Sequence, residues 1–157
     1  MSQQFSEHWS RWIKASCAKH FSGISDETKF FVEGFVRDTE NLPDWVEFRI
    51  DGPFIKEHTR ESWELAIEIN VLISVTEGVD IYRQEVIVGR VTELFLDCIR
   101  VYRYGNGPDD DQTELGCLEL RKPSNREKLT VSNFGKLRPD TQLTQASVEG
   151  HYLMFLD

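Results

Sequence analysis

The sequence lacks the motifs by which many enzymes and nucleotide-binding proteins are recognised. It has no GxxxxGK[ST], GxGxxG or GxSxG segment, and therefore no signature of a phosphate-binding loop or a serine nucleophile. Its 4 histidines show no HxH or HxxxH spacing, and the acidic run at 109–111 lacks the pattern of a calcium-binding loop. We therefore expect a protein that is not an enzyme and that has no catalytic residues, cofactor or metal site.

Cysteine is scarce. The chain has 3 cysteines, Cys17, Cys98 and Cys117, which are widely separated and form no CxxC pair. An odd number of distant cysteines indicates neither a disulfide framework nor a zinc site. We expect all three to be reduced and mostly buried.

Long apolar runs and an excess of basic charge are also missing. No apolar run approaches the 18 or more residues that cross a bilayer, and no basic and apolar leader opens the chain. We expect a soluble protein that is made inside the cell and binds no membrane. The net charge of −9 argues against a sequence-independent nucleic-acid binder, but it allows a polyanion to move past without sticking.

The clearest pattern that is present lies in residues 62–76, SWELAIEINVLISVT. Every second residue from Trp63 to Val75 is apolar, and this period of two predicts a strand. At about 3.3 Å per residue the strand is longer than usual, so it should be the central or longest strand of a sheet. We expect it to overhang its neighbours and to lean on a helix or another subunit, with Leu72 at that contact.

Two segments have helical periodicity. In residues 5–21, Phe5, Trp9, Ile13, Cys17 and Phe21 recur every four positions. A second helix is predicted from Asp80, as its N-cap, to about Leu96. Both helices should pack on the sheet with their apolar stripes.

The other strands are predicted from shorter patterns. Residues 29–36 and 45–50 are rich in aromatic and β-branched residues, and Asp51-Gly52-Pro53 should end the second of these strands. Residues 54–61 then form a polar connector, and strands 45–50 and 62–76 should pair antiparallel. Residues 98–104 and 115–120 should form a hairpin with an acidic turn at about 105–115, and residues 146–156 form a terminal strand. Residues 122–142 should be a loop or an accessory hairpin.

These elements together predict a single α+β domain over residues 1–157. Its sheet should be twisted and mostly antiparallel, with the N-terminal helix and the central helix packed on one face.

The order and hydrophobic pattern of the elements resemble the tail terminator proteins of long-tailed bacteriophages, the neck subunits that close the head-proximal end of the tail tube. The matching segments are the helix at 5–21, Ser62–Leu65 and Ile69–Leu72 in the long strand, the helix at 81–95, the acidic turn at 108–111 and the strand at 146–156. The extra segment at 122–142 and the longer stretch before residue 62 depart from the smaller members of that family.

The resemblance implies a structural virion protein that forms a homo-oligomeric ring, a hexamer, with no enzymatic activity. Its partners would be the tail tube protein and the head-tail connector protein, and DNA would pass through the lumen without specific binding. Assembly would take place in the host cytoplasm, and the protein would end in the neck of the virion. The expected ring or neck contacts are Leu72, Asp109, Asp110, Asp111, Arg126, Lys128, Lys136 and Arg138.

Other functions remain compatible with the sequence. Another head-tail joining or tail-completion protein would share the same pattern. A protein of a different class, a small acidic inhibitor or immunity-type module, would use the net charge of −9 to mask a basic surface on its target. An enzyme of an unrecognised kind is a further alternative.

Overall fold

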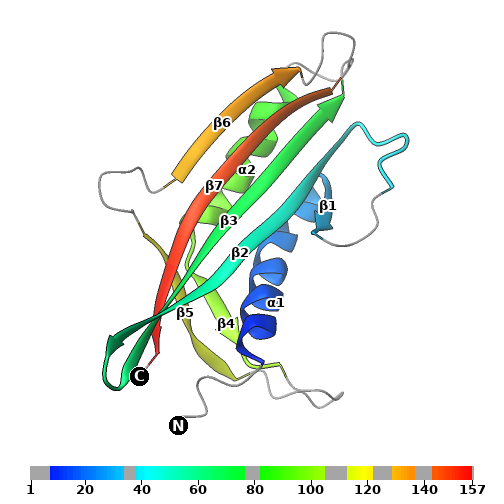
Figure 1. Cartoon of the computed structure of the whole chain (residues 1–157). Helices are drawn as coiled ribbons and strands as arrows, with labels where there is room; N and C mark the ends of the chain where they lie inside the picture. The colour runs from blue at the N-terminus through cyan, green and yellow to red at the C-terminus, as the bar shows by residue number, and fades with distance from the viewer. Residues whose placement is uncertain are drawn as a thin grey trace.

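The computed structural model describes residues 8–33, 38–76, 82–104, 113–121, 129–136 and 143–156, which form an α+β fold (Figure 1). Two α-helices and one 3-10 helix combine with seven strands among these residues. The elements are α1 Trp9–Phe21, the 3-10 helix η2 Ser22–Asp26, β1 Lys29–Val32, β2 Asp44–Thr59, β3 Ser62–Thr76, α2 Arg83–Leu96, β4 Ile99–Tyr102, β5 Glu114–Leu120, β6 Leu129–Lys136 and β7 Leu143–Leu156. None of the described helices is long and apolar enough to cross a bilayer.

The described strands make one sheet in the order β1-β2-β3-β7-β5-β4, and β6 also pairs with β7. All pairs are antiparallel except β1 with β2, which is parallel. The predicted strand at residues 62–76 is β3, and its central position is confirmed. Two strands share the edge of β7 that faces away from β3. β6 pairs with the first half of β7, and β5 pairs with its second half.

β3 is not the longest strand, and the expectation that it overhangs its neighbours is wrong. β2 has 16 residues, β3 has 15 and β7 has 14. β7 pairs with β3 along its whole length, from Trp63 opposite Leu156 to Thr76 opposite Leu143. The backbone of β3 therefore finds its partners within the chain and needs no neighbouring subunit.

The predicted end of β2 at Asp51-Gly52-Pro53 is also wrong, because the strand continues to Thr59. The register shifts between Asp51 and Phe54, Gly52 takes a φ of 110°, and the Gly52–Pro53 peptide is cis. Among the described residues, β1 covers only the part of β2 that ends at Phe48, so Pro53 lies on an edge with no described strand partner, where no backbone donor is required. The polar connector predicted at residues 54–61 is therefore mostly strand, and β2 and β3 form a long hairpin.

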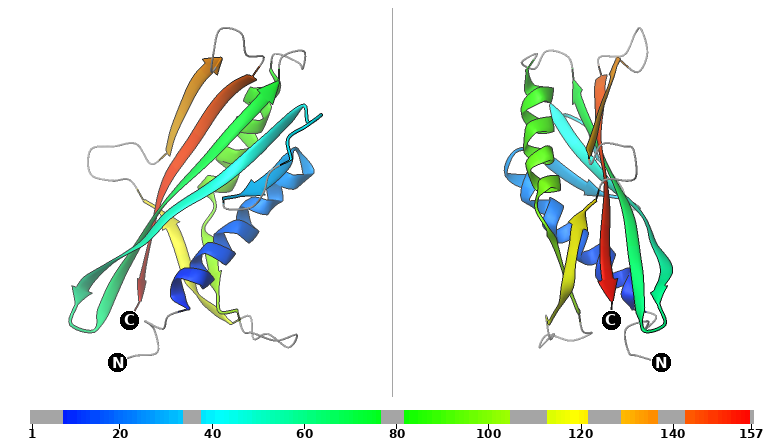
Figure 2. Two further views of the ribbon diagram at one scale, coloured as in Figure 1. Left: turned by 45° about the vertical axis from the view of Figure 1, so that its right-hand side comes forward. Right: turned by 90° about the vertical axis from the view of Figure 1, so that its left-hand side faces the viewer.

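Both α-helices pack on the same face of the sheet, as predicted (Figure 2). α1 buries Trp9, Ile13, Cys17 and Phe21 of its predicted stripe, whereas Phe5 lies outside the described residues. α2 buries Ile87, Val91 and Phe95. The sheet meets them with the apolar set of β3, in which Leu65, Ile67, Ile69, Val71 and Ile73 are at most 1% exposed. Alternation along the strands therefore creates a two-layer core. Asp80 lies outside the described residues, and α2 begins at Arg83.

The predicted hairpin of β4 and β5 is confirmed, but the prediction for its cysteines is wrong. Cys98 and Cys117 form a disulfide between the start of β4 and β5, with Cα atoms 6.1 Å apart. Only Cys17 is a free buried thiol. The hairpin brings together two cysteines that are 19 residues apart in sequence, and their spacing alone does not reveal this pairing. The predicted acidic tip of the hairpin lies outside the described residues.

Residues 129–136 of the segment predicted as a loop or hairpin form β6. This strand pairs antiparallel with β7 from Leu129 opposite Gly150 to Lys136 opposite Thr144. β7 starts at Leu143, three residues before the predicted terminal strand. The second interpretation of this segment, an accessory hairpin, is the one that agrees with the structure.

Candidate functional site

Both described α-helices lie on one side of the sheet, and no helix among the placed elements covers the opposite face (Figure 1). We call it the open face. Side chains that alternate with the buried set of β2, β3 and β7 point to it, because successive strand residues face opposite sides. Its central part is polar and is formed by Glu47, Arg49, Glu68, Asn70, Ser147, Glu149 and His151. An open polar face beside an apolar core is a surface on which ligands or partners can bind.

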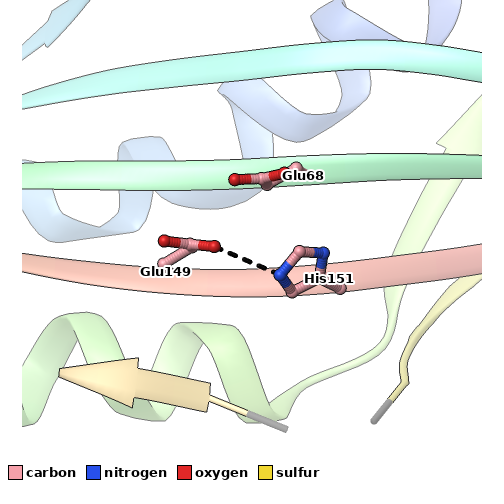
Figure 3. Close-up of side chains that lie close together, drawn as sticks. All are labelled: Glu68, Glu149 and His151. Atoms are coloured by element: carbon pink, nitrogen blue, oxygen red, sulfur yellow. Dashed lines mark hydrogen bonds and ion pairs between the residues drawn. The ribbon is translucent and has the colours of Figure 1, made fainter. Parts of the chain in front are cut away.

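A cluster of three ionisable side chains lies in the middle of the open face. Glu68 of β3 is directly opposite His151 of β7, and Glu149 is two residues before His151 on the same face of β7. His151 Nε2 is 3.1 Å from Glu149 Oε1, and one potential ligand atom from each of the three residues lies within 4.8 Å of the others (Figure 3). All three side chains are half-buried. Among the described residues, this cluster could hold a metal ion.

Negative charge dominates this cluster. Burial raises the pKa of Glu68 above its ordinary value of 4.5, and a hydrogen bond and the charge of Glu149 raise it further. Asp51, which is opposite Glu68 on β2, acts in the same direction, whereas His151 lowers the pKa. Burial and the neighbouring carboxylates therefore act together against the charged form of Glu68.

Glu68→Gln is expected to stabilise the metal-free protein at neutral pH by up to about 1 kcal/mol, because it removes a like-charge contact between neighbouring strands. The raised pKa means that the folded protein binds a proton at Glu68 more tightly than the unfolded chain. The stabilisation from protonated Glu68 is thus lost as the pH rises from 4.5 through the raised pKa. Urea unfolding between about pH 4 and about pH 7 measures this difference.

The advantage of Glu68→Gln should shrink as the pH falls. Glu93→Gln is the matched control, because the Glu93 side chain is 67% exposed and pairs with Arg90 on its own helix. An equal effect of both variants at neutral pH would contradict the repulsion between Glu68 and Glu149.

The structure describes two of the eight residues that were predicted as ring or neck contacts. Leu72 lies half-buried on the open face between Glu47 and Ser147, and Lys136 is exposed at the end of β6. The other six lie outside the described residues, namely Asp109, Asp110, Asp111, Arg126, Lys128 and Arg138. Only Leu72 of β3 and Lys136 of β6 can therefore be placed, and β7 lies between their two strands.

Sequence reasoning missed an exposed apolar patch on the β2–β3 hairpin, which projects past the helices beside the end of β7 (Figure 1). Phe54 is 58% exposed, Ile55 49% and Phe155 46%. Phe54 and Phe155 lie on the open face, whereas Ile55, which is opposite Leu65, lies on the other face of the hairpin. We call these three residues the arm patch, which therefore covers both faces of the hairpin. The polar connector predicted at residues 54–61 begins with Phe54 and Ile55, directly after Gly52-Pro53. These two adjacent apolar side chains are a signal in the sequence that the segment is a strand.

Two exposed apolar residues lie near the other end of β7. Val131 is 50% exposed and Phe134 56% exposed, and both belong to β6, whose second edge has no strand partner among the described residues. We call them the edge patch. Scattered apolar residues are normal on protein surfaces, but an unpaired strand edge that carries two of them favours association with another chain.

A cleft of about 700 Å³ lies between α1 and the β4–β5 hairpin. Arg100 Nη1 of β4 is 3.2 Å from Glu114 Oε2 of β5, and Lys19 Nζ of α1 lies 6.0 Å from the centre of the Tyr102 ring of β4. These three charged side chains of the cleft are thus engaged in contacts within the protein, so the cleft is a weaker candidate than the open face.

Comparison with known proteins gives information about the fold only. No family model and no curated protein matches the sequence. Among solved structures, one chain whose title states no function matches with a TM-score of 0.53 at 11% identity, and the match covers 94% of this chain and 97% of that chain. At this identity the similarity shows a shared fold across nearly the whole of both chains.

Proposed function

We propose that this chain is a non-enzymatic ring subunit of a phage neck, a tail terminator that caps the head-proximal end of the tail tube. The element order on which the resemblance rests is present in the described residues. An N-terminal helix precedes a long central strand, which is followed by a second helix, a hairpin and a terminal strand. The arrangement supports the proposal because it places both helices on one side and leaves the open face and the strand edges for neighbours.

The observation that carries the proposal is the separation of the two apolar patches. Phe155 is near the end of β7, whereas the edge patch flanks Asn133, which is opposite Ala146 near the start of β7. The nine residue steps from position 146 to position 155 span about 30 Å of strand. Two different patches so far apart favour a head-to-tail contact, in which one subunit's arm patch meets the next subunit's edge patch. A contact of this kind closes into a ring when the rotation per subunit is suitable.

The charge of the chain fits the remaining parts of the proposal. A net charge of −9 allows a lumen through which DNA passes without adhering. The tail tube protein and the head-tail connector protein would contact the two rims of the ring. The ring would be a hexamer, and the protein would assemble in the host cytoplasm and remain in the neck of the virion.

Native mass spectrometry with negative-stain imaging tests the proposal, and the expected result is a six-membered ring. Ile55→Asp in the arm patch and Val131→Asp in the edge patch should each give monomers, because a charge buried at a contact without a partner is unfavourable. Lys56→Ser is the matched control on the same strand and should leave the ring intact, since Lys56 is an exposed polar residue outside both patches.

Mixing the two monomeric variants sharpens the test. In a head-to-tail contact each variant keeps the patch that the other has lost, so the mixture should form dimers with one copy of each variant. Circular dichroism of each variant confirms that it is folded. A wild-type monomer at all concentrations, with no dimer in the mixture, would overturn the proposal. If that monomer captured a basic protein, the inhibitor alternative would replace it.

A further inference from the structure

We propose that Glu68, Glu149 and His151 bind one divalent transition metal ion on the open face, with Zn²⁺ as the reference ion. Nothing in the ring proposal requires this site, so each can fail without the other.

The backbone already holds the three ligands in place. Glu68 and His151 are direct partners on β3 and β7, which pair along their whole length, and Glu149 shares their face two residues away. These are the central strands of the sheet, so little backbone ordering remains to be done when a metal binds. Glu149 and His151 are positioned by one strand, and Glu68 approaches from the next.

The distances suit a small ion. Zinc bonds to carboxylate oxygen and imidazole nitrogen are about 2.0 to 2.2 Å, which places neighbouring ligand atoms of a tetrahedral site about 3.3 Å apart. His151 Nε2 and Glu149 Oε1 are 3.1 Å apart, close to one edge of that tetrahedron. One donor atom of each of the three residues lies within 4.8 Å of the other two, so a side-chain rotation of Glu68 completes the set. Water would take the fourth position.

The charges around the cluster also favour a cation. Glu68, Glu149 and Asp51 bring three carboxylates to one part of the open face. Arg49 is the nearest cation along β2, but its Nη2 lies 3.4 Å from Glu47 on the same strand. A divalent ion between Glu68 and Glu149 would turn their mutual repulsion into attraction to the ion.

The donor set distinguishes between classes of metal. Imidazole nitrogen suits zinc, cobalt and nickel, whereas calcium takes six to eight oxygen ligands and magnesium binds oxygen in octahedral geometry. One histidine and two carboxylates therefore predict that Zn²⁺ binds and that Mg²⁺ and Ca²⁺ at equal concentration do not compete.

Isothermal titration of chelator-treated protein with Zn²⁺ tests the proposal. One equivalent should bind in the micromolar range, and Glu68→Gln and His151→Gln should each weaken binding by about tenfold or more. Glu68→Gln is expected to fold well without metal, so weaker binding by this variant cannot be attributed to unfolding. The addition of Zn²⁺ should raise the melting temperature of the wild type and leave that of Glu68→Gln almost unchanged.

Two control variants separate the site from general surface binding. Glu93→Gln removes an exposed carboxylate, and His58→Gln removes an exposed histidine outside the cluster. Both should bind Zn²⁺ like the wild type. The proposal is overturned if no equivalent of Zn²⁺ binds, if Glu68→Gln and His151→Gln bind like the wild type, or if Mg²⁺ binds equally well.

Discussion

Phe95→Ala is expected to lower the free energy of unfolding by about 3 to 5 kcal/mol, the usual cost of deleting a buried aromatic ring. Phe95 is 0% exposed and lies where α2 meets α1 and the sheet. Its ring centre is 4.8 Å from that of Phe21 in α1 and 6.2 Å from that of Tyr152 in β7. Removal of the ring would leave a cavity between the two layers, because the surrounding backbone belongs to paired strands and helices that cannot collapse fully.

Gly150 makes the packing at this position specific. A Cβ atom at Gly150 would lie 2.6 Å from Phe95 Cδ1, so β7 accepts the ring only because this residue has no side chain. The Tyr152 hydroxyl also donates a hydrogen bond to the Phe95 carbonyl oxygen. Gly150→Ala should therefore be destabilising by about 1 to 3 kcal/mol through overpacking. The double variant with Phe95→Ala should cost less than the sum, since the added methyl group fills part of the cavity.

Chemical denaturation of the three variants measures these effects. Leu96→Ala is the matched control, because Leu96 is the next residue of the same helix and is 63% exposed. Its change should be small. If Phe95→Ala cost no more than Leu96→Ala, or if the double variant were strictly additive, Phe95 would not lie over Gly150.

Regular alternation made the central strand predictable. The observed bounds of β3, Ser62–Thr76, agree with the prediction, because every second residue from Trp63 to Val75 is apolar. The residues between them in the first half of the strand are mostly polar. The same reasoning failed for β2, where Gly52-Pro53 ordinarily signals a turn. Nothing in a local pattern shows that β1 stops short of this part of β2, whose edge pairs with no other described strand and so tolerates a proline.

The candidate site was unpredictable for a related reason. Period two places Glu149 and His151 on one face of their strand, and Glu68 on one face of β3. Which residues of the two strands lie opposite each other depends on the register, and this register sets Glu68 opposite His151 across 83 positions of sequence. The spacing of histidines along the chain carries no signal of this cluster, because its residues come from two different strands.

The cysteine prediction illustrates the same limit. An odd count and wide spacing argued for three thiols, but the predicted hairpin at residues 98–104 and 115–120 already placed Cys98 and Cys117 on neighbouring strands. With the register of that hairpin, the pairing could have been proposed. Residues that are far apart in the sequence can therefore be assigned to one site only when the pairing and register of their strands are known.

Arg83→Met is expected to destabilise the protein by about 2 to 4 kcal/mol, because it leaves a buried carboxylate without its cation. Arg83 Nε donates to Asp44 Oδ2 at 2.9 Å, and its other nitrogens contact Glu27. The Asp44 side chain is only 6% exposed, and its second contact is the Thr28 hydroxyl, which donates to Oδ1. The arginine thus joins the first turn of α2 to the start of β2 and to the end of η2.

A double-mutant cycle with Asp44→Asn separates the loss of this pair from the loss of packing. Arg83→Met/Asp44→Asn should recover part of the stability that Arg83→Met loses, because the amide carries no charge that needs a partner. Arg90→Met is the matched control on the same helix. Its partner Glu93 is 67% exposed, and an exposed pair contributes about 0 to 1 kcal/mol. Urea unfolding of the four variants gives the comparison, and equal costs for Arg83→Met and Arg90→Met would show that Asp44 does not depend on Arg83.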